Sequence, residues 1–380
     1  MTDVAAIAEG LTRIEARGPC TDAERRAAGS LHDALRAAGH EAWVETHWVR
    51  PQSALSLALH ATIGVVASVA ALAAPLPALI AAALAALSMA FEAAGRLGPL
   101  RLLFLRRATQ TVVTVPEEGG VTLLLCARYD APRGGLATRD GARRLAARLR
   151  RVLGGRGAGP RAWAAVALAL IAVCAGLRLL DVEGAWLGVL QFVPTVALLG
   201  ALAAAGDIAI APVLPGGESA PAVAVALYAE LRRNPPAALF PALLLYGAGE
   251  GGPQALRAHL RREQPDRAAI VVLELGPCGA GTPAYATAHP QLRTAAARAA
   301  DAVGGAARAP LRHTSGAGAA RARRLPALWI GALDDDGIAP SGPLDPAAAE
   351  RALDFALACV DALDAELGAS PPGVDATQLH

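Results

Sequence analysis

Acidic side chains follow several apolar segments of this 380-residue chain, where they could perform chemistry together. The apolar run 121–127 leads into Arg128 and Asp130, and the run 268–275 carries Glu274 near its end. Other acids lie in loops after apolar runs or just before a helix: Glu218, Glu250 and Asp335. Carboxylates collected at the carboxyl edge of a parallel sheet are the ligands that an oxygen-coordinated metal ion needs.

The elements that would position these acids alternate between strands and helices. Period-2 or uniformly apolar runs predict strands at 41–48, 109–115, 121–127, 238–248, 268–275 and 325–333. Helical patterns cover 21–40, with Thr21 and Glu24 as a predicted capping box, and 219–234, 253–263 and 345–367. This alternation predicts an α/β fold, with a mostly parallel or mixed sheet flanked by helices.

Long apolar segments interrupt that pattern, in a chain that is 54% hydrophobic. Residues 52–91 carry no charge, and as one helix they would extend about 60 Å, twice the thickness of a bilayer core. Pro75 and Pro77 break the segment, so we expect a transmembrane hairpin over 53–94 and a second one over 162–205. His60 is the single ionisable residue that we expect in these spans, as an interfacial residue.

Charge distribution suggests orientation and partners. Arginines such as Arg50, Arg96 and Arg161 flank the outer ends of the predicted hairpins, so the positive-inside rule places the soluble part in the cytoplasm. Alanine, glycine and arginine usage is typical of a GC-rich bacterial genome, and we expect an integral protein of a bacterial inner membrane. A net charge of +2 and 4% aromatic residues argue against a nucleic-acid partner.

We therefore expect a discontinuous α/β domain built from 1–50, 100–160 and 207–370. About four transmembrane helices are inserted into it, and residues 371–380 form a disordered tail.

The order of the acidic motifs resembles the two-zinc aminopeptidase family, metallopeptidase family 28, whose relatives include glutamate carboxypeptidase, the transferrin receptor and nicalin. Where that family has His-x-Asp after a strand, this chain has Arg128-Tyr129-Asp130. Glu218 stands where the family's Asp-Asn-Ala-Ser-Gly motif begins, and Glu274 where a strand ends in aspartate. The resemblance covers about 1–50, 105–135 and 207–370, and it implies an aminopeptidase-like fold.

The departures from the family pattern concern catalysis. The family motif Gly-Ala-Glu-Glu-x-Gly corresponds to residues 247–252, which places Gly249 at the general base and Glu250 at the second glutamate. Counting back from the last helix places Asp335 or a neighbour at a histidine ligand. Arginine cannot be deprotonated, so Arg128 cannot bind a metal ion at the other histidine position. The resemblance thus implies an inactive pseudopeptidase without a cofactor, which binds or scaffolds a peptide or membrane-protein partner.

Other interpretations stay open at this point. The main alternative is an active metallo-aminopeptidase or hydrolase, whose carboxylate-rich site of Glu218, Glu250, Glu274 and Asp335 holds zinc or another divalent metal. For Arg128 itself we hypothesise a salt-bridge role beside Asp130 that partly replaces the charge of a metal ion. Arg128 could instead point into solvent, or the carboxylates could hold Mg²⁺ or Ca²⁺.

Overall fold

The chain divides into two compact units in the computed structural model, which describes residues 4–115, 119–152, 159–339 and 344–368. One unit consists of 1–51, 107–132 and 213–380, and the other of 52–106 and 133–212. Residues 100–106, 133–152, 159–160 and 207–212, which we expected in the α/β domain, belong to the second unit. The predicted disordered tail, 371–380, lies outside the described residues.

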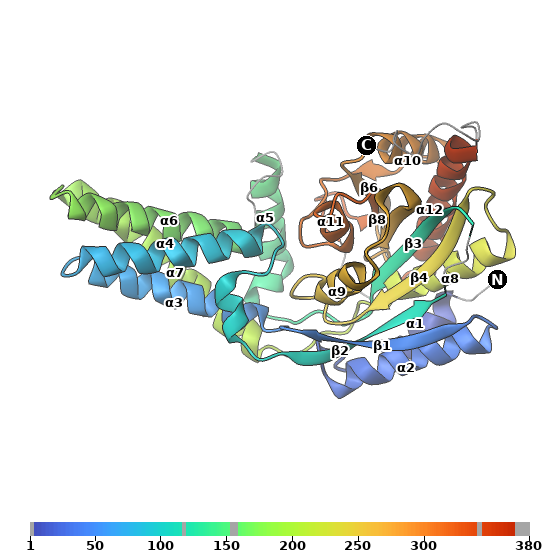
Figure 1. The fold of residues 1–380 in the computed structure, drawn as a ribbon, viewed down its shortest axis with the longest axis horizontal. Coiled ribbons are helices and arrows are strands. Elements are labelled where there is room, and N and C mark those ends of the chain that lie inside the picture. Colours follow the sequence, from blue (N-terminus) through green and yellow to red (C-terminus); the bar gives the residue numbers. More distant parts are fainter. Residues whose placement is uncertain (1–3, 116–118, 153–158, 340–343, 369–380) are drawn as a thin grey trace. The chain divides into compact units, whose positions relative to one another are not determined.

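An eight-stranded mixed sheet forms the centre of the α/β unit (Figure 1). The strand order is β1-β2-β4-β3-β5-β8-β6-β7, with parallel pairing from β4 through β3 and β5 to β8. β1 and β2 extend this parallel part as antiparallel strands, and β6 pairs antiparallel to β8. The bounds are β1 Ala42–Val49, β2 Arg107–Thr114, β3 Val121–Arg128, β4 Leu239–Tyr246, β5 Ile270–Leu275, β6 Thr282–Thr287, β7 Ala307–Arg308 and β8 Ala327–Leu333.

Two apolar cores cover the two faces of this sheet, because successive side chains of a strand point to opposite faces. Leu123 and Leu125 of β3 pack in one core, whereas Leu124 and Cys126 pack in the other. The first core includes α1 (Val4–Thr12), α2 (Asp22–Ala37), α8 (Ser219–Arg233), α10 (Pro290–Ala302) and α12 (Pro346–Gly368). The second includes α9 (Gln254–Glu263) and α11 (Gly316–Arg321). By the same alternation, Arg128 and Glu274 lie on the α9–α11 face.

Four helices of the second unit are long and apolar enough to cross a membrane: α3 (Ser53–Ala70), α4 (Pro75–Ala93), α6 (Pro160–Leu179) and α7 (Ala185–Ile210). Small residues such as Ala61, Ala82 and Ala85 fill their shared core. A Cβ on Gly64 would lie 2.4 Å from Leu198, so α3 and α7 approach closely at this glycine. The unit also contains α5 (Asp140–Val152) and the 3-10 turns Pro99–Leu103 and Leu136–Thr138.

The polar residues of these helices correct our expectation for His60. His60 is fully buried, with its ring nitrogens 2.9 Å from Ser88 Oγ and 2.7 Å from the Ser56 carbonyl oxygen. It is also not the single ionisable residue of the spans, since buried Glu92 lies within α4. Glu92 accepts a hydrogen bond from Ser56 and lies 3.6 Å from the Arg101 guanidinium. The apolar helices therefore enclose a connected polar cluster.

Candidate functional site

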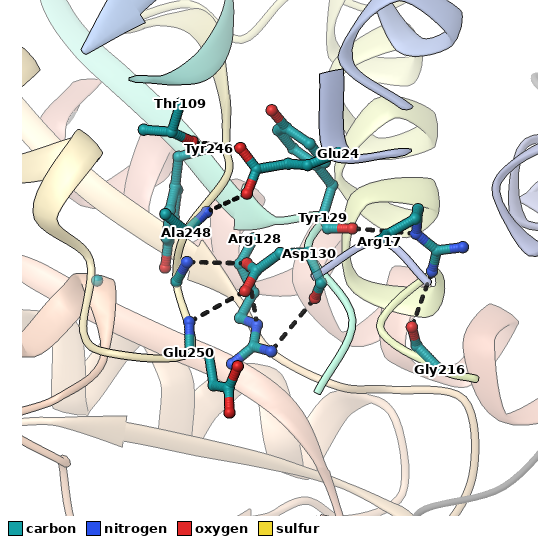
Figure 2. Close-up of polar contacts among 12 residues, drawn as sticks. Arg17, Glu24, Thr109, Arg128, Tyr129, Asp130, Gly216, Tyr246, Ala248 and Glu250 are labelled. Carbon is teal, nitrogen blue, oxygen red and sulfur yellow. Dashed lines mark hydrogen bonds and ion pairs between the residues drawn. The ribbon is translucent and has the colours of Figure 1, made fainter. Parts of the chain in front are cut away.

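The carboxyl end of β3 holds a fully buried carboxylate whose two oxygens are both hydrogen-bonded. Asp130 Oδ1 accepts from the backbone N–H of Gly249 at 2.9 Å, and Oδ2 accepts from that of Glu250 at 3.0 Å (Figure 2). Arg128 Nε lies 3.6 Å from Oδ1, and its Nη2 donates to the Asp130 carbonyl oxygen at 3.2 Å. Arg128 therefore folds back onto Asp130, and its side chain is only 29% exposed.

The loop after β4 has no room for a side chain at position 249. A Cβ on Gly249 would lie 2.9 Å from Asp130 Oδ1 and 3.0 Å from Arg128 Cβ. The close approach lets the loop backbone donate to Asp130, so glycine is the residue that this arrangement needs. Position 249 therefore offers neither a carboxylate nor space for one.

Arg128 also faces a second carboxylate. Figure 2 shows the Glu250 carboxylate beside the Arg128 guanidinium. Burial acts to lower the pKa of Arg128, but the nearby carboxylates of Asp130, Glu250 and Glu274 outweigh it and raise the pKa. The guanidinium is thus a fixed positive charge among several acidic groups, which agrees with the salt-bridge hypothesis and not with a side chain in free solvent.

Glu274 of β5 is satisfied by the protein itself. Its Oε1 accepts from the Tyr246 hydroxyl at 3.0 Å and from the Gly316 N–H at 2.7 Å, and its Oε2 accepts from the Ala317 N–H at 2.8 Å. Burial raises the pKa of Glu274, although these three donors act in the opposite direction. The N–H groups at the start of α11 therefore stabilise the Glu274 carboxylate in place of a positively charged partner.

Glu218 lies beside a buried arginine that the sequence motifs did not indicate. Arg17 Nη2 lies 3.4 Å from Glu218 Oε2 and donates to the Gly216 carbonyl at 2.8 Å (Figure 2). The same guanidinium donates to the carbonyl oxygens of Leu11 in α1, of Ile14 after α1 and of Tyr129. Arg17 is 3% exposed, and Tyr129, Gly216 and Glu218 are more than a hundred residues away in the sequence, so no local pattern could reveal these contacts.

Asp335 lies in an exposed turn after β8, and the contacts of the described residues do not connect it with the other acids. Within the described ranges, no three of Asp130, Glu218, Glu250, Glu274 and Asp335 bring ligand oxygens within 4.8 Å of one another. Metal binding by the predicted set of Glu218, Glu250, Glu274 and Asp335 stays a prediction.

Glu24 binds the loop next to the site, although the sequence predicted it only as half of a capping box. The N–H of Glu24 does donate to Thr21 Oγ1 at 3.2 Å, as a helix cap requires. Its carboxylate, however, accepts from the N–H groups of Cys20 at 2.8 Å and Ala248 at 2.9 Å, and from the Thr109 hydroxyl. Burial raises the pKa of Glu24 to about 7, against the effect of these hydrogen bonds. Glu24 thereby holds the loop that binds Asp130.

The residues at the zinc-ligand positions of the resembled family do not fit a two-zinc centre. Arg128 cannot coordinate a metal ion, and both Asp130 oxygens already accept backbone hydrogen bonds. A metal ion would have to share Asp130 with those donors and approach a fixed guanidinium charge. The arrangement can instead hold acidic groups together without a cation.

Comparisons with known proteins support the fold. No family model matches the chain, and no curated protein matches its sequence. A zinc-dependent exopeptidase from Parabacteroides distasonis is 10% identical, with a TM-score of 0.50 over 95% of this chain and 96% of that one. A zinc aminopeptidase from Bacillus subtilis (9% identical, TM-score 0.49, 95% of each chain) and a glutaminyl cyclase from Fimbriiglobus ruber (11%, 0.47, 95% and 94%) are also similar. At such identity, the match to the exopeptidase shows that this chain has an aminopeptidase-like fold.

Proposed function

We propose that this protein is a membrane-embedded pseudopeptidase, an aminopeptidase-like domain that binds or scaffolds a peptide or membrane-protein partner without hydrolysing it. The observation that carries the proposal is the Arg128–Asp130 pair, with both Asp130 oxygens hydrogen-bonded to the loop at Gly249 and Glu250. These contacts supply Asp130 with a positive charge and two donors without a metal ion, which supports a site that does not hydrolyse peptides.

Peptide hydrolysis requires a group that activates water, and hydrogen-bond donors or a positive charge that stabilise the developing oxyanion. Gly249 supplies no base, and Glu274 is engaged by Tyr246 and by two backbone N–H groups. Arg128 has a suitable charge, but that charge is directed at Asp130 and its neighbours. The site therefore has binding groups without the acid–base pair that turnover demands.

The four long apolar helices support the membrane part of the proposal. Their exposed faces carry leucine, valine and isoleucine, whereas their shared core is built from small residues. Arginines at the outer ends favour a cytoplasmic α/β unit under the positive-inside rule. We place the protein in a bacterial inner membrane on these grounds, without a nucleic-acid partner.

Hydrolysis of fluorogenic aminoacyl amides by the full chain, purified in detergent with and without added Zn²⁺, tests the proposal. We expect no turnover above that of a preparation lacking the protein. Zinc-dependent hydrolysis that is lost in Glu274→Gln and kept in Glu263→Gln, an exposed control on α9, would overturn it. That result would favour the carboxylate-rich hydrolase instead.

A further inference from the structure

Two histidines and a glutamate meet between β1 and α9, away from the acids at the carboxyl end of β3. Glu45 and His47 are two residues apart in β1, so both side chains point to the sheet face that α9 covers. His259 of α9 completes the group. All three residues are more than nine-tenths buried, with relative exposures of 8%, 7% and 7%.

The ligand atoms of this group already have the spacing of a coordination sphere. Glu45 Oε2 lies 3.2 Å from His47 Nε2 and 3.1 Å from His259 Nδ1, and the three atoms all lie within 4.8 Å of one another. Zinc–ligand bonds of about 2.0–2.1 Å in a tetrahedron place neighbouring ligand atoms about 3.3 Å apart. Small side-chain movements would therefore suffice for a cation to bind.

Buried polar atoms around the group lack the partners that a closed protein core would require. His47 Nε2 makes no hydrogen bond, although it lies 3.2 Å from Glu45 Oε2. Thr111, which is paired with Glu45 across β1 and β2, has a buried hydroxyl that is also without a hydrogen-bond partner. An unpartnered buried imidazole nitrogen aimed at a carboxylate is what a metal ion would satisfy.

The other oxygen of Glu45 is held by donors from outside the group. Glu45 Oε1 accepts from Trp43 Nε1 at 3.0 Å and from the Arg262 guanidinium. These bonds orient the carboxylate and leave Oε2 facing the two imidazoles, as hydrogen bonds to the ligands do in metal sites. Arg262 is half exposed, so its positive charge is partly screened by solvent.

We propose that Glu45, His47 and His259 bind one Zn²⁺ ion, which clamps α9 onto the edge strand β1. Two imidazoles and one carboxylate form a donor set that zinc prefers, with a water as the fourth ligand. The site is independent of the proposed loss of peptidase activity, because it uses none of the residues around Asp130.

Zinc titration of the chelator-stripped full chain in detergent tests this site. We expect one equivalent to bind tightly, and affinity to fall more than ~10-fold in His47→Gln and in His259→Gln, since each removes a ligand. The matched control His32→Gln, on the surface of α2, should bind like the wild type. Cobalt substituted for zinc should give the absorption of a four-coordinate ion in the wild type, and this absorption should be lost in both ligand variants.

Three results would overturn the proposal: no bound zinc in the wild type, unchanged affinity in both ligand variants, or loss of zinc in Glu274→Gln. The last result would place the metal at the carboxyl end of β5 and would contradict the pseudopeptidase as well. Size-exclusion chromatography and circular dichroism identify a variant that fails to fold. If one histidine variant misfolds, the other decides the outcome.

Discussion

Replacing Glu24 by glutamine should make the protein more stable at pH 8 than the wild type and nearly equal to it at pH 5. Glu24 is fully buried, and burial raises its pKa from 4.5 to about 7. The folded protein therefore holds this proton more tightly than the unfolded chain does. As pH rises from about 4.5 to 7, the unfolded chain loses the proton first, and the free energy of unfolding decreases.

The pKa shift of Glu24 determines how much the free energy of unfolding changes with pH. Each pKa unit corresponds to about 1.4 kcal/mol, so full titration of Glu24 lowers the free energy of unfolding by about 3 kcal/mol, of which about 2.5 kcal/mol falls between pH 5 and pH 8. Glutamine does not titrate. Its carbonyl oxygen can accept from the N–H groups of Cys20 and Ala248, and its amide can donate to Thr109.

Thermal unfolding of the full chain in detergent, followed at half-unit steps from pH 5 to pH 8, measures the difference. We expect the midpoint of Glu24→Gln minus that of the wild type to rise by about 5–10 °C over this range. Glu41→Gln makes the same chemical change at an exposed position before β1 and should follow the wild type. Parallel curves for Glu24→Gln and the wild type would refute a buried carboxyl group with a raised pKa.

Two further substitutions address the contacts of Asp130. Arg128→Met should lower the free energy of unfolding by about 2–4 kcal/mol, because it leaves the buried Asp130 carboxylate without its ion pair, and the partial exposure of the arginine moderates the loss. Chemical denaturation measures the loss, with the exposed substitution Arg96→Met as the control. Equal stability of the Arg128→Met and Arg96→Met variants would contradict the ion pair. Gly249→Ala should cost about 1–3 kcal/mol, because its Cβ would press on Asp130 and Arg128; an unchanged midpoint in the same assay would show that the loop has room.

The sequence predicted the strands that carry strong apolar patterns. The runs at 121–127 and 268–275 are β3 and β5, and the four apolar helices lie where the long uncharged segments indicated. β6 was missed because TPAYAT contains proline and alanine where strand formers are expected. α11 was missed because its six residues, GAGAAR, include two glycines and are stabilised by the Ser315 cap and by Glu274.

The acidic positions were visible in sequence, but their partners were not. Arg17 reaches Tyr129 and Glu218 across more than a hundred residues, so only the folded chain brings these groups together. The β1–α9 group joins Glu45 and His259, which are likewise distant in sequence. One local signal was available there. Glu45 and His47 lie on the strand face that also buries Val49, and exposed residues alternate with them. Two polar side chains on a buried strand face are costly unless they bind a partner.

The buried carboxyl groups of this fold are satisfied in different ways, and the difference indicates where a cation belongs. Asp130 has an arginine and two backbone donors, Glu274 has a hydroxyl and the start of a helix, and Glu24 has three donors and a raised pKa. Each of these groups has its hydrogen-bond partners within the protein itself. Glu45 has one oxygen held by Trp43 and Arg262, and its other oxygen faces two imidazoles, one of them with an unpartnered nitrogen. A cation at the carboxyl end of β3 would compete with several existing donors, whereas between β1 and α9 it would replace one imidazole–carboxylate hydrogen bond and give His47 Nε2 a partner. For this reason we expect the metal chemistry of this chain at the sheet edge.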